Sequence, residues 1–338
     1  MKSLKLLLII SLTLISISGA YSQDEDVIKL IEQGITLHDS GEFDQAIEIY
    51  NQALELDPGS PLIHYELALS YFSKGDLEKA IEYSDLVLES GDDYLLEAYM
   101  TKGSALDNLG RTQESIELFN QAISETDGHY LLSFNLALNY FKIDDLVNAE
   151  HYVIDAIYRN INHGSSHLLL AELNHKIEHS QRAILAAHFF LFIEPNTDRS
   201  DRGFEILMSN FEGRVKKNAE DSTSTTITID MDKDDDASGA DILLGLLEAS
   251  KSNEANVDKS EDELFIEHTD LFFSTLEVFG NNDLYKDIYH SFYSDLAESD
   301  HLTTYCKYIT QKFNENSQTW LSENEQKLLD FDAWLQEN

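Results

Sequence analysis

An internal repeat constrains this chain of 338 residues more than any other feature. Glu66 to Phe72 reads ELALSYF and Asn135 to Phe141 reads NLALNYF, so two similar segments lie 69 residues apart, about two periods of 34. Repeats of roughly 20 to 50 residues are typical of stacked supersecondary units that bury a continuous core between neighbours. The sequence therefore predicts a helical repeat array.

Five frames of this length align along the first half of the chain. They cover residues 27–60, 61–95, 96–129, 130–163 and 164–197, with starting residues Val27, Pro61, Leu96, Tyr130 and Gly164. The eighth position is always small: Gly34, Ala68, Gly103, Ala137 and Ala171. The twentieth is also small: Ala46, Ala80, Ser115, Ala149 and Ala183. Small residues at both positions allow the two helices of one repeat to cross closely.

The fifteenth position predicts the turn between the two helices of each frame. It is Gly41, Gly75 and Gly110 in the first three frames, and glycine readily adopts the left-handed conformation that ends a helix. Asp144 and Glu178 replace it in the last two frames. The fifth frame also departs from the pattern at its eleventh and twenty-seventh positions, Asn174 and Phe190.

The period, the small residues and the turn glycines together resemble the tetratricopeptide repeat family over Val27 to about Thr197, roughly half of the chain. The resemblance implies an all-α fold, a right-handed superhelix of helix-turn-helix repeats, with a concave groove lined by the first helix of each repeat. Partners of this family usually bind in that groove. The segment 198–217, which carries Phe204, Ile206, Leu207, Met208 and Phe211, is predicted to form a helix that caps the fifth repeat.

In this family the second, fifth, ninth and twelfth positions of a repeat generally point into the groove. They predict a largely apolar and aromatic groove that turns polar in the third repeat. In the first repeat they are Ile28, Ile31, Ile35 and His38. The candidate partner-binding residues are Leu62, Tyr65, Leu69, Phe72, Met100, Asp107, Asn108, Leu131, Phe134, Leu138, Phe141, Glu172 and His175.

An apolar stripe on a protein surface is usually covered by other residues, and the sequence leaves two possibilities for what covers this one. A partner helix or extended peptide would lie in the groove, or the stripe would pack within the array or against the C-terminal region. Some family members bind acidic C-terminal peptides through groove lysines and arginines. This sequence lacks those basic positions, which disfavours that class of ligand.

The composition changes at 218–239, where serine, threonine and aspartate without apolar periodicity predict a solvated linker. Asp230, Asp232, Asp234 and Asp241 fall at positions 1, 3, 5 and 12 of a calcium-loop template. The turn glycine of that template is replaced by Asp235, which favours a solvated acidic linker over a calcium site.

Apolar residues spaced by three and four return at 240–338 and predict a second, C-terminal helical domain of four or five helices. Both tryptophans, Trp320 and Trp334, lie in this region, so we expect it to have its own core. The single cysteine, Cys306, lies in an aromatic stretch and is expected to be a buried structural thiol.

Charge and the first residues bear on partners and on location. A formal net charge of −40 argues against nucleic acid and against anionic lipid as partners. Lys2 and Lys5, the apolar run Leu6–Ile17 and the small residues Ser18–Ala20 predict a secretory signal peptide over 1–20. Once it is cleaved, no membrane insertion is expected, and the chain would be periplasmic or secreted.

Candidates for chemistry are few. His175 and His179 have the spacing of a zinc-binding pair, but the repeat frame places His179 at a turn. Glu172 with His175, and Glu298 with His301, have di-iron spacing without matching glutamates. No metal or other cofactor is therefore expected.

The sequence favours a non-enzymatic protein–protein interaction scaffold or adaptor of the bacterial cell envelope, which binds a protein or peptide in the repeat groove. A glycan- or small-molecule-binding protein, or an unrecognised enzyme in the C-terminal helices, are the alternatives.

Overall fold

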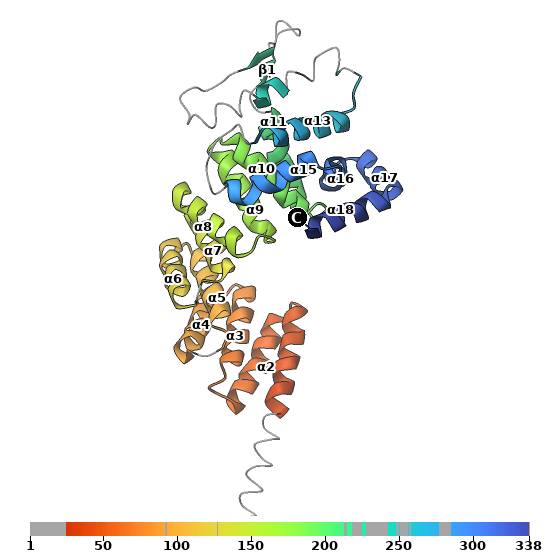
Figure 1. Ribbon diagram of the computed structural model, residues 1–338. Helices are drawn as coiled ribbons and strands as arrows, with labels where there is room; N and C mark the ends of the chain where they lie inside the picture. Colours follow the sequence, from red (N-terminus) through yellow and green to blue (C-terminus); the bar gives the residue numbers. More distant parts are fainter. Residues whose placement is uncertain are drawn as a thin grey trace, which may run out of the picture. The chain divides into compact units, whose positions relative to one another are not determined.

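The computed structural model shows an all-α protein made of consecutive helix pairs, which confirms the predicted fold class (Figure 1). It describes residues 25–91, 93–126, 128–212, 215–217, 225–227, 243–247, 250, 256, 258–276 and 285–337. The predicted signal peptide and the four aspartates of the calcium template lie outside these residues. The chain divides into two compact units, which we call unit 1, Met1–Asp145, and unit 2, Leu146–Asn338.

Unit 1 contains seven helices in its described residues, and each neighbouring pair from α2 onward is in contact. They are residues 25–39, α2 (Phe43–Leu56), α3 (Pro61–Lys74), α4 (Leu77–Ser90), α5 (Leu95–Asn108), α6 (Thr112–Glu125) and α7 (Tyr130–Lys142). The first four predicted frames each open on one of the first helices. Pro61 fits the first turn of α3, because its missing N–H would have no partner there.

The turn residues adopt the conformation that the repeat pattern predicts. Gly41, Gly75 and Gly110 have φ of 78°, 91° and 77°. Asp144 and Glu178, which replace glycine at the same position, also have positive φ, 63° and 59°. The turn thus needs the left-handed conformation in all five frames, and the last two frames adopt it at the cost that a Cβ imposes.

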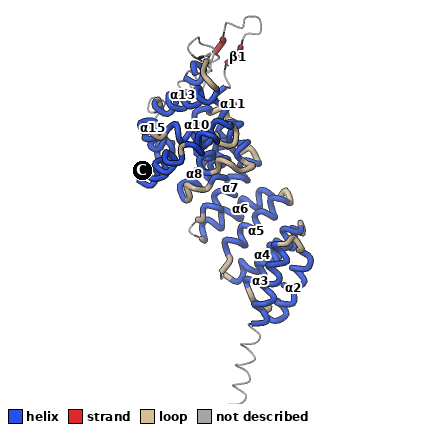
Figure 2. Tube along the Cα trace, turned by 90° about the vertical axis from the view of Figure 1, so that its right-hand side faces the viewer, coloured by secondary structure: helices blue, strands red, loops and turns tan. Residues whose placement is uncertain are grey.

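Unit 2 begins with the remaining repeat helices, α8 (Leu146–Arg159), α9 (Gly164–Lys176) and α10 (Ser180–Ile193). The predicted capping helix is present but shorter than 198–217. It is α11, Ser200–Glu212, and packs on α10 and α9. Residues 215–217 instead form strand β1 (Val215–Lys217), which pairs antiparallel with β2 (Thr225–Ile227) (Figure 2). Val215 faces Ile227 in this register, and β-branched residues favour extended backbone.

The C-terminal part of unit 2 is a set of short helices. They are residues 243–247, α13 (Glu261–Ser274), the π-helix η2 (Lys286–His290), α15 (Ser291–Glu298), α16 (Leu302–Ile309), α17 (Glu315–Glu323) and α18 (Glu325–Glu337). Both η2 and α16 contact α10. The two compact units therefore differ from the predicted domains, which placed all five repeats in one domain and began a second at residue 240.

The core of the C-terminal helices continues into the fifth repeat, because tyrosines of these helices are buried against α9 and α10. On α9, His167 Nε2 donates to the carbonyl oxygen of Ile161 at 2.7 Å, so its Nδ1 accepts from the Tyr289 hydroxyl at 2.8 Å. Asn174 Nδ2 donates to the Tyr285 hydroxyl oxygen, also at 2.8 Å. These bonds join segments more than a hundred residues apart.

Helix α10 makes the same kind of contact. The Tyr293 hydroxyl donates to the carbonyl oxygen of Leu185 at 3.0 Å, and the Tyr305 hydroxyl lies 3.1 Å from His188 Nδ1. Complete burial among aromatic rings lowers the pKa of His188 to about 3, and burial lowers that of His167 to about 4. Both histidines are therefore neutral parts of the core.

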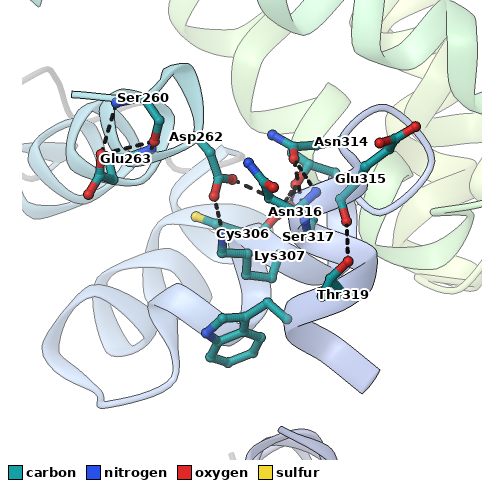
Figure 3. A network of polar contacts seen from close by, with 12 residues as sticks. Ser260, Asp262, Glu263, Cys306, Lys307, Asn314, Glu315, Asn316, Ser317 and Thr319 are labelled. Carbon is teal, nitrogen blue, oxygen red and sulfur yellow. Dashed lines mark hydrogen bonds and ion pairs between the residues drawn. The ribbon is translucent and has the colours of Figure 1, made fainter. Parts of the chain in front are cut away.

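A buried ion pair fastens the C-terminal helices to one another (Figure 3). Lys307 of α16 donates to one carboxylate oxygen of Asp262 in α13, and Ser317 Oγ of α17 donates to the other at 3.3 Å. Thr310 Oγ1 lies 2.9 Å from the same serine oxygen. Neighbouring Cys306 is a buried free thiol, as expected, and burial raises its pKa.

Candidate functional site

The candidate binding residues of unit 1 lie on its first helices, and we call this surface the first-helix face. It consists of the second, fifth, ninth and twelfth frame positions: Ile28, Ile31, Ile35, His38, Leu62, Tyr65, Leu69, Phe72, Glu97, Met100, Ser104, Asp107, Leu131, Phe134, Leu138 and Phe141. Helix α3 contacts α5, and α5 contacts α7. His38 Nδ1 lies 2.8 Å from Ser70 Oγ, which joins the helix of residues 25–39 to α3.

The eighth frame positions explain how these helices are held. An added Cβ on Gly34 would collide with the ring of Tyr50, and one on Gly103 with the ring of Phe119. Each ring belongs to the second helix of the same repeat and fills the space that the glycine leaves. In these two repeats the first helix thus lies close against the second helix.

Apolar side chains are indeed accessible on this face. Ile28, Ile35 and Leu138 are 54%, 37% and 38% exposed. The predicted partner-binding leucines and aromatic residues of α3 and α7 are otherwise half-buried: Leu62, Tyr65, Leu69, Phe72, Leu131, Phe134 and Phe141. Ile31 differs, since it is buried in the core beside α2.

Helix α5 contributes a polar middle section. Asp107 Oδ1 accepts from Lys142 Nζ and from Thr112 Oγ1, both at 2.8 Å, so this carboxylate is held in place. Met100 Sδ lies 3.6 Å from the side-chain amide of Asn135, and Asn108 is exposed. The first-helix face therefore has a polar section on α5 between the apolar sections of α3 and α7.

Two tyrosines that the frame does not pair lie together at the junction of α3 and α5. The rings of Tyr65 and Tyr94 stack with centroids 5.5 Å apart and planes 9° from parallel. Tyr94 precedes α5 and has φ of 69°, an uncommon conformation for a bulky residue. Burial raises the pKa of Tyr65, and the charges of Glu66 and Glu97 add to this effect.

The charge of unit 1 is strongly one-sided. Residues 25–145 contain 25 acidic and six basic side chains, and every basic side chain lies within 4.0 Å of a carboxylate. The pairs are Lys29–Asp26, Lys74–Asp44, Lys79–Glu82, Lys102–Asp85, Arg111 with Glu78 and Glu114, and Lys142–Asp107. An acidic ligand would have to displace one of these carboxylates.

The last two candidate residues, Glu172 and His175, belong to unit 2 and are engaged by α11. Arg202 Nε donates to Glu172 Oε1 at 3.1 Å, and Asn210 Nδ2 lies 2.9 Å from His175 Nδ1. Helix α11 thus contacts both Glu172 and His175. Packing against a following part of the chain is one of the two ways in which the sequence allowed the predicted groove to be covered. For the fifth repeat we therefore no longer expect these side chains to receive a partner.

The spacings typical of metal sites are not matched by clusters in the described part of the chain. No group of three or more histidine, cysteine, aspartate or glutamate side chains there could hold a metal ion. His301 instead packs against the rings of Phe331 and Trp334, with centroids 5.9 and 5.6 Å away. None of the described helices has the length and apolar character that crossing a membrane requires.

Comparison with known protein families identifies the repeats. A family model described as TPR repeat matches residues 34–75, and one described as tetratricopeptide repeat matches residues 62–90 and 96–127. These segments cover the helix of residues 25–39 from Gly34 onward and helices α2 to α6. The glycine turns and the close helix crossings described above thus lie in the matched part.

Curated relatives share part of this region. A TPR repeat-containing protein of Methanocaldococcus jannaschii is 25% identical over 122 residues, 36% of this chain and 21% of the relative. The mitochondrial import receptor subunit TOM70 of Saccharomyces cerevisiae is 30% identical over 111 residues, 33% of this chain and 17% of the relative. The chain thus spans about a fifth of the length of these relatives.

Solved structures with a similar arrangement of helices include PilF of Pseudomonas aeruginosa. Its TM-score is 0.46 at 21% identity, over 56% of this chain and 90% of that one. PilW, described as a widely conserved type IV pilus biogenesis factor, has a TM-score of 0.47 at 17% identity, over 55% of this chain and 90% of that one. The chain thus contains tetratricopeptide repeats between residues 34 and 127, where the family models match.

Proposed function

We propose that this protein is a non-enzymatic scaffold of the bacterial cell envelope, which binds a partner protein or peptide on the first-helix face of unit 1. Tetratricopeptide repeats in general support protein–protein interaction. The observation that carries the proposal is the exposure of three apolar side chains, Ile28, Ile35 and Leu138, on the first helices of the first and fourth repeats. Apolar side chains that are exposed to water favour an apolar partner surface.

The mechanism is recognition by shape and apolar anchors. Half-buried Tyr65 and Phe72 offer large side chains that lose little conformational freedom when a partner covers them. The excess of carboxylates around the face discourages acidic competitors. The envelope location is supported by the basic and then apolar N-terminal residues, which have the layout of a cleavable export signal.

The binding face can be tested with matched leucines. Leu138 on α7 and Leu86 on α4 have the same exposed fraction, 38%, but only Leu138 belongs to the first-helix face. A photo-crosslinking amino acid at Leu138 should give a defined adduct in the producing cells, and one at Leu86 should not. The Ile35→Ser variant should reduce the Leu138 adduct at unchanged protein level. Equal adducts from both positions would argue against this face.

Export is tested separately. The mature N-terminus of the full-length chain, expressed in its own host, should begin after residue 20 in the envelope fraction. A variant with Leu8→Arg should accumulate uncleaved in the cytoplasm, because a charge in the apolar run blocks signal recognition. Cytoplasmic accumulation of the unaltered chain with its first residues intact would refute the envelope location and leave the binding face untouched.

A further inference from the structure

The stacked pair Tyr65–Tyr94 joins α3 to the connection between α4 and α5. Pro61 and Leu96 are 35 residues apart, although the connection between α4 and α5, residues 91–94, has four residues like the connections at 57–60, 126–129 and 160–163. Within it, Gly91 and Tyr94 both have positive φ, 66° and 69°. Glycine adopts this conformation freely, whereas tyrosine does so only when its surroundings hold it there.

Tyr94 obtains no helix-capping benefit from this conformation. It occupies the N-cap position of α5, and its side chain makes no capping hydrogen bond. What the conformation achieves is the placement of its ring parallel to that of Tyr65. Strained backbone positions cluster at functional sites, where the surrounding structure holds them.

The charges around this pair are negative. Glu97 is exposed in the first turn of α5, three residues after Tyr94, and acts electrostatically on Tyr65. Glu66 follows Tyr65 in α3 and is buried, with Oε2 accepting from the Tyr50 hydroxyl at 3.1 Å. The six basic side chains of residues 25–145 are all paired elsewhere on unit 1.

We propose that Tyr65, Tyr94 and Glu97 bind a lysine or arginine side chain of the partner, so that the partner segment is basic and apolar. Aromatic faces attract cations, and the adjacent carboxylate supplies the opposite charge. Leu62 and Leu69, one helical turn to either side of Tyr65, accept the apolar residues that flank the cation. This inference rests on the proposed function and specifies the chemistry of its partner.

Charge complementarity selects this occupant over others. Residues 25–145 carry 25 carboxylates, and their six basic side chains are already paired, so they would repel an acidic segment. An uncharged apolar segment would give the Glu97 carboxylate no opposite charge to pair with. A basic segment gains attraction at the site and a faster encounter with the acidic surface. Its binding should therefore weaken as salt rises.

The test is a cycle of paired changes on the full mature chain. Two fluorescein-labelled 14-residue helical peptides have leucine at positions i, i+3, i+4 and i+7 and glutamine elsewhere, but one carries a single central lysine. Anisotropy should show the lysine peptide binding about fivefold or more tightly. The Glu97→Gln variant should abolish that difference, whereas Glu117→Gln, an exposed carboxylate of second helix α6, should preserve it.

Variants of Tyr94 separate recognition from folding. Tyr94→Phe keeps the ring and should bind the lysine peptide as the unaltered chain does. Tyr94→Gly adopts positive φ without strain, so it should fold normally by circular dichroism and lose the lysine preference. Equal loss in Glu97→Gln and Glu117→Gln, or an unchanged preference in Tyr94→Gly, would overturn the site.

Failure of this site is distinguishable from failure of the proposed function. If crosslinking through Leu138 captures a partner, and Glu97→Gln and Tyr94→Gly leave that adduct unchanged, the first-helix face binds without this cation site. If Leu138 gives no adduct beyond that of Leu86, the binding face itself is wrong. Binding of a glutamate-containing version of the peptide as tightly as the lysine version also refutes the inference.

Discussion

The buried pair Asp262–Lys307 offers the sharpest test of how unit 2 holds together. Its side chains are 8% and 9% exposed and join α13 to α16, while Ser317 connects α17 to the same carboxylate. Asp262→Ala leaves the Lys307 ammonium buried without its counter-ion. Breaking such a pair from one side costs about 3–5 kcal/mol, and much of that is the uncompensated charge.

Two nearby carboxylates on α13 supply matched controls. Glu261 lies in the same first turn but is exposed, so Glu261→Ala loses only its favourable interaction with the helix N-terminus, about 0.3–1 kcal/mol. Glu267 pairs with Lys259 Nζ at 2.6 Å, with its side chain 52% exposed, and an exposed pair contributes about 0–1 kcal/mol. Asp262→Ala, Glu261→Ala and Glu267→Ala each remove one negative charge from α13.

Urea unfolding followed by tryptophan fluorescence isolates unit 2, because Trp320 and Trp334 are the only tryptophans of the chain. With a slope of about 2 kcal/mol per molar urea, Asp262→Ala should lower the midpoint by about 2 M, and each control by less than about 0.5 M. The double variant Asp262→Leu, Lys307→Met should recover most of the loss, since well-packed apolar residues often replace a buried pair without cost. A loss for Asp262→Ala no larger than that of the controls would refute the reasoning.

Three further predictions concern other buried groups. Burial lowers the pKa of His167 to about 4 and of His188 to about 3, so the unfolded chain binds protons at these residues before the folded chain does as pH falls below about 6.5. Each histidine should therefore lower the unfolding free energy of unit 2 by about 3 kcal/mol between pH 6.5 and 4. In urea unfolding at a series of pH values, the His188→Phe variant should lose the part of this pH dependence that His188 causes. Gly103→Val should destabilise unit 1 by about 1–3 kcal/mol in circular dichroism melts, since its Cβ would meet the aromatic ring of α6, whereas Gly59→Ala, with nothing within 4 Å, should cost less than about 1 kcal/mol. Cys306 should react with a thiol reagent in urea but scarcely in buffer, because burial shields the sulfur and raises its pKa; rapid reaction in buffer would contradict its burial.

The helix pairs could be predicted from the sequence because a period of 34 with small residues at fixed positions has few physical solutions. The turn at Gly75 and the close crossing at Gly103 follow from local requirements that one residue type meets best. Accessibility follows the frame less closely, since Leu138 is exposed whereas Ile31, another predicted groove position, is buried. These features depend on residues that lie close together in the sequence.

Contacts over long sequence distances escaped prediction. Nothing near His167 indicates that its partner is Tyr289, 122 residues away, since several other tyrosines of the C-terminal helices would serve as well. Asp262 is one of 63 acidic residues, and only the fold distinguishes it as the buried one that meets Lys307. The stacking of Tyr65 on Tyr94 depends on the positive φ of Tyr94, which the sequence pattern does not predict.

The departures from the repeat pattern nevertheless mark where a helix pair meets something other than the next repeat. In the fifth frame, Asn174 stands at an eleventh position that is otherwise leucine or tyrosine, and its amide bonds to Tyr285. Phe190 stands at a twenty-seventh position that is otherwise alanine or valine, and its ring fills the place of the missing Cβ of Gly203 in α11. Both departures are explained by segments that follow the repeats in the chain.

The third frame departs in a way that its own unit does not explain. Its second position is Glu97, where the other repeats of unit 1 have isoleucine or leucine, and Tyr94, three residues before it, has positive φ. No helix of residues 25–145 supplies a cation to this carboxylate, because each of the six basic side chains there pairs with another acid. The departures at Asn174 and Phe190 have partners within the chain and serve packing. Glu97 has no such cation partner on residues 25–145, and Tyr94 beside it has a strained backbone, so this is the first position at which to seek an external basic partner.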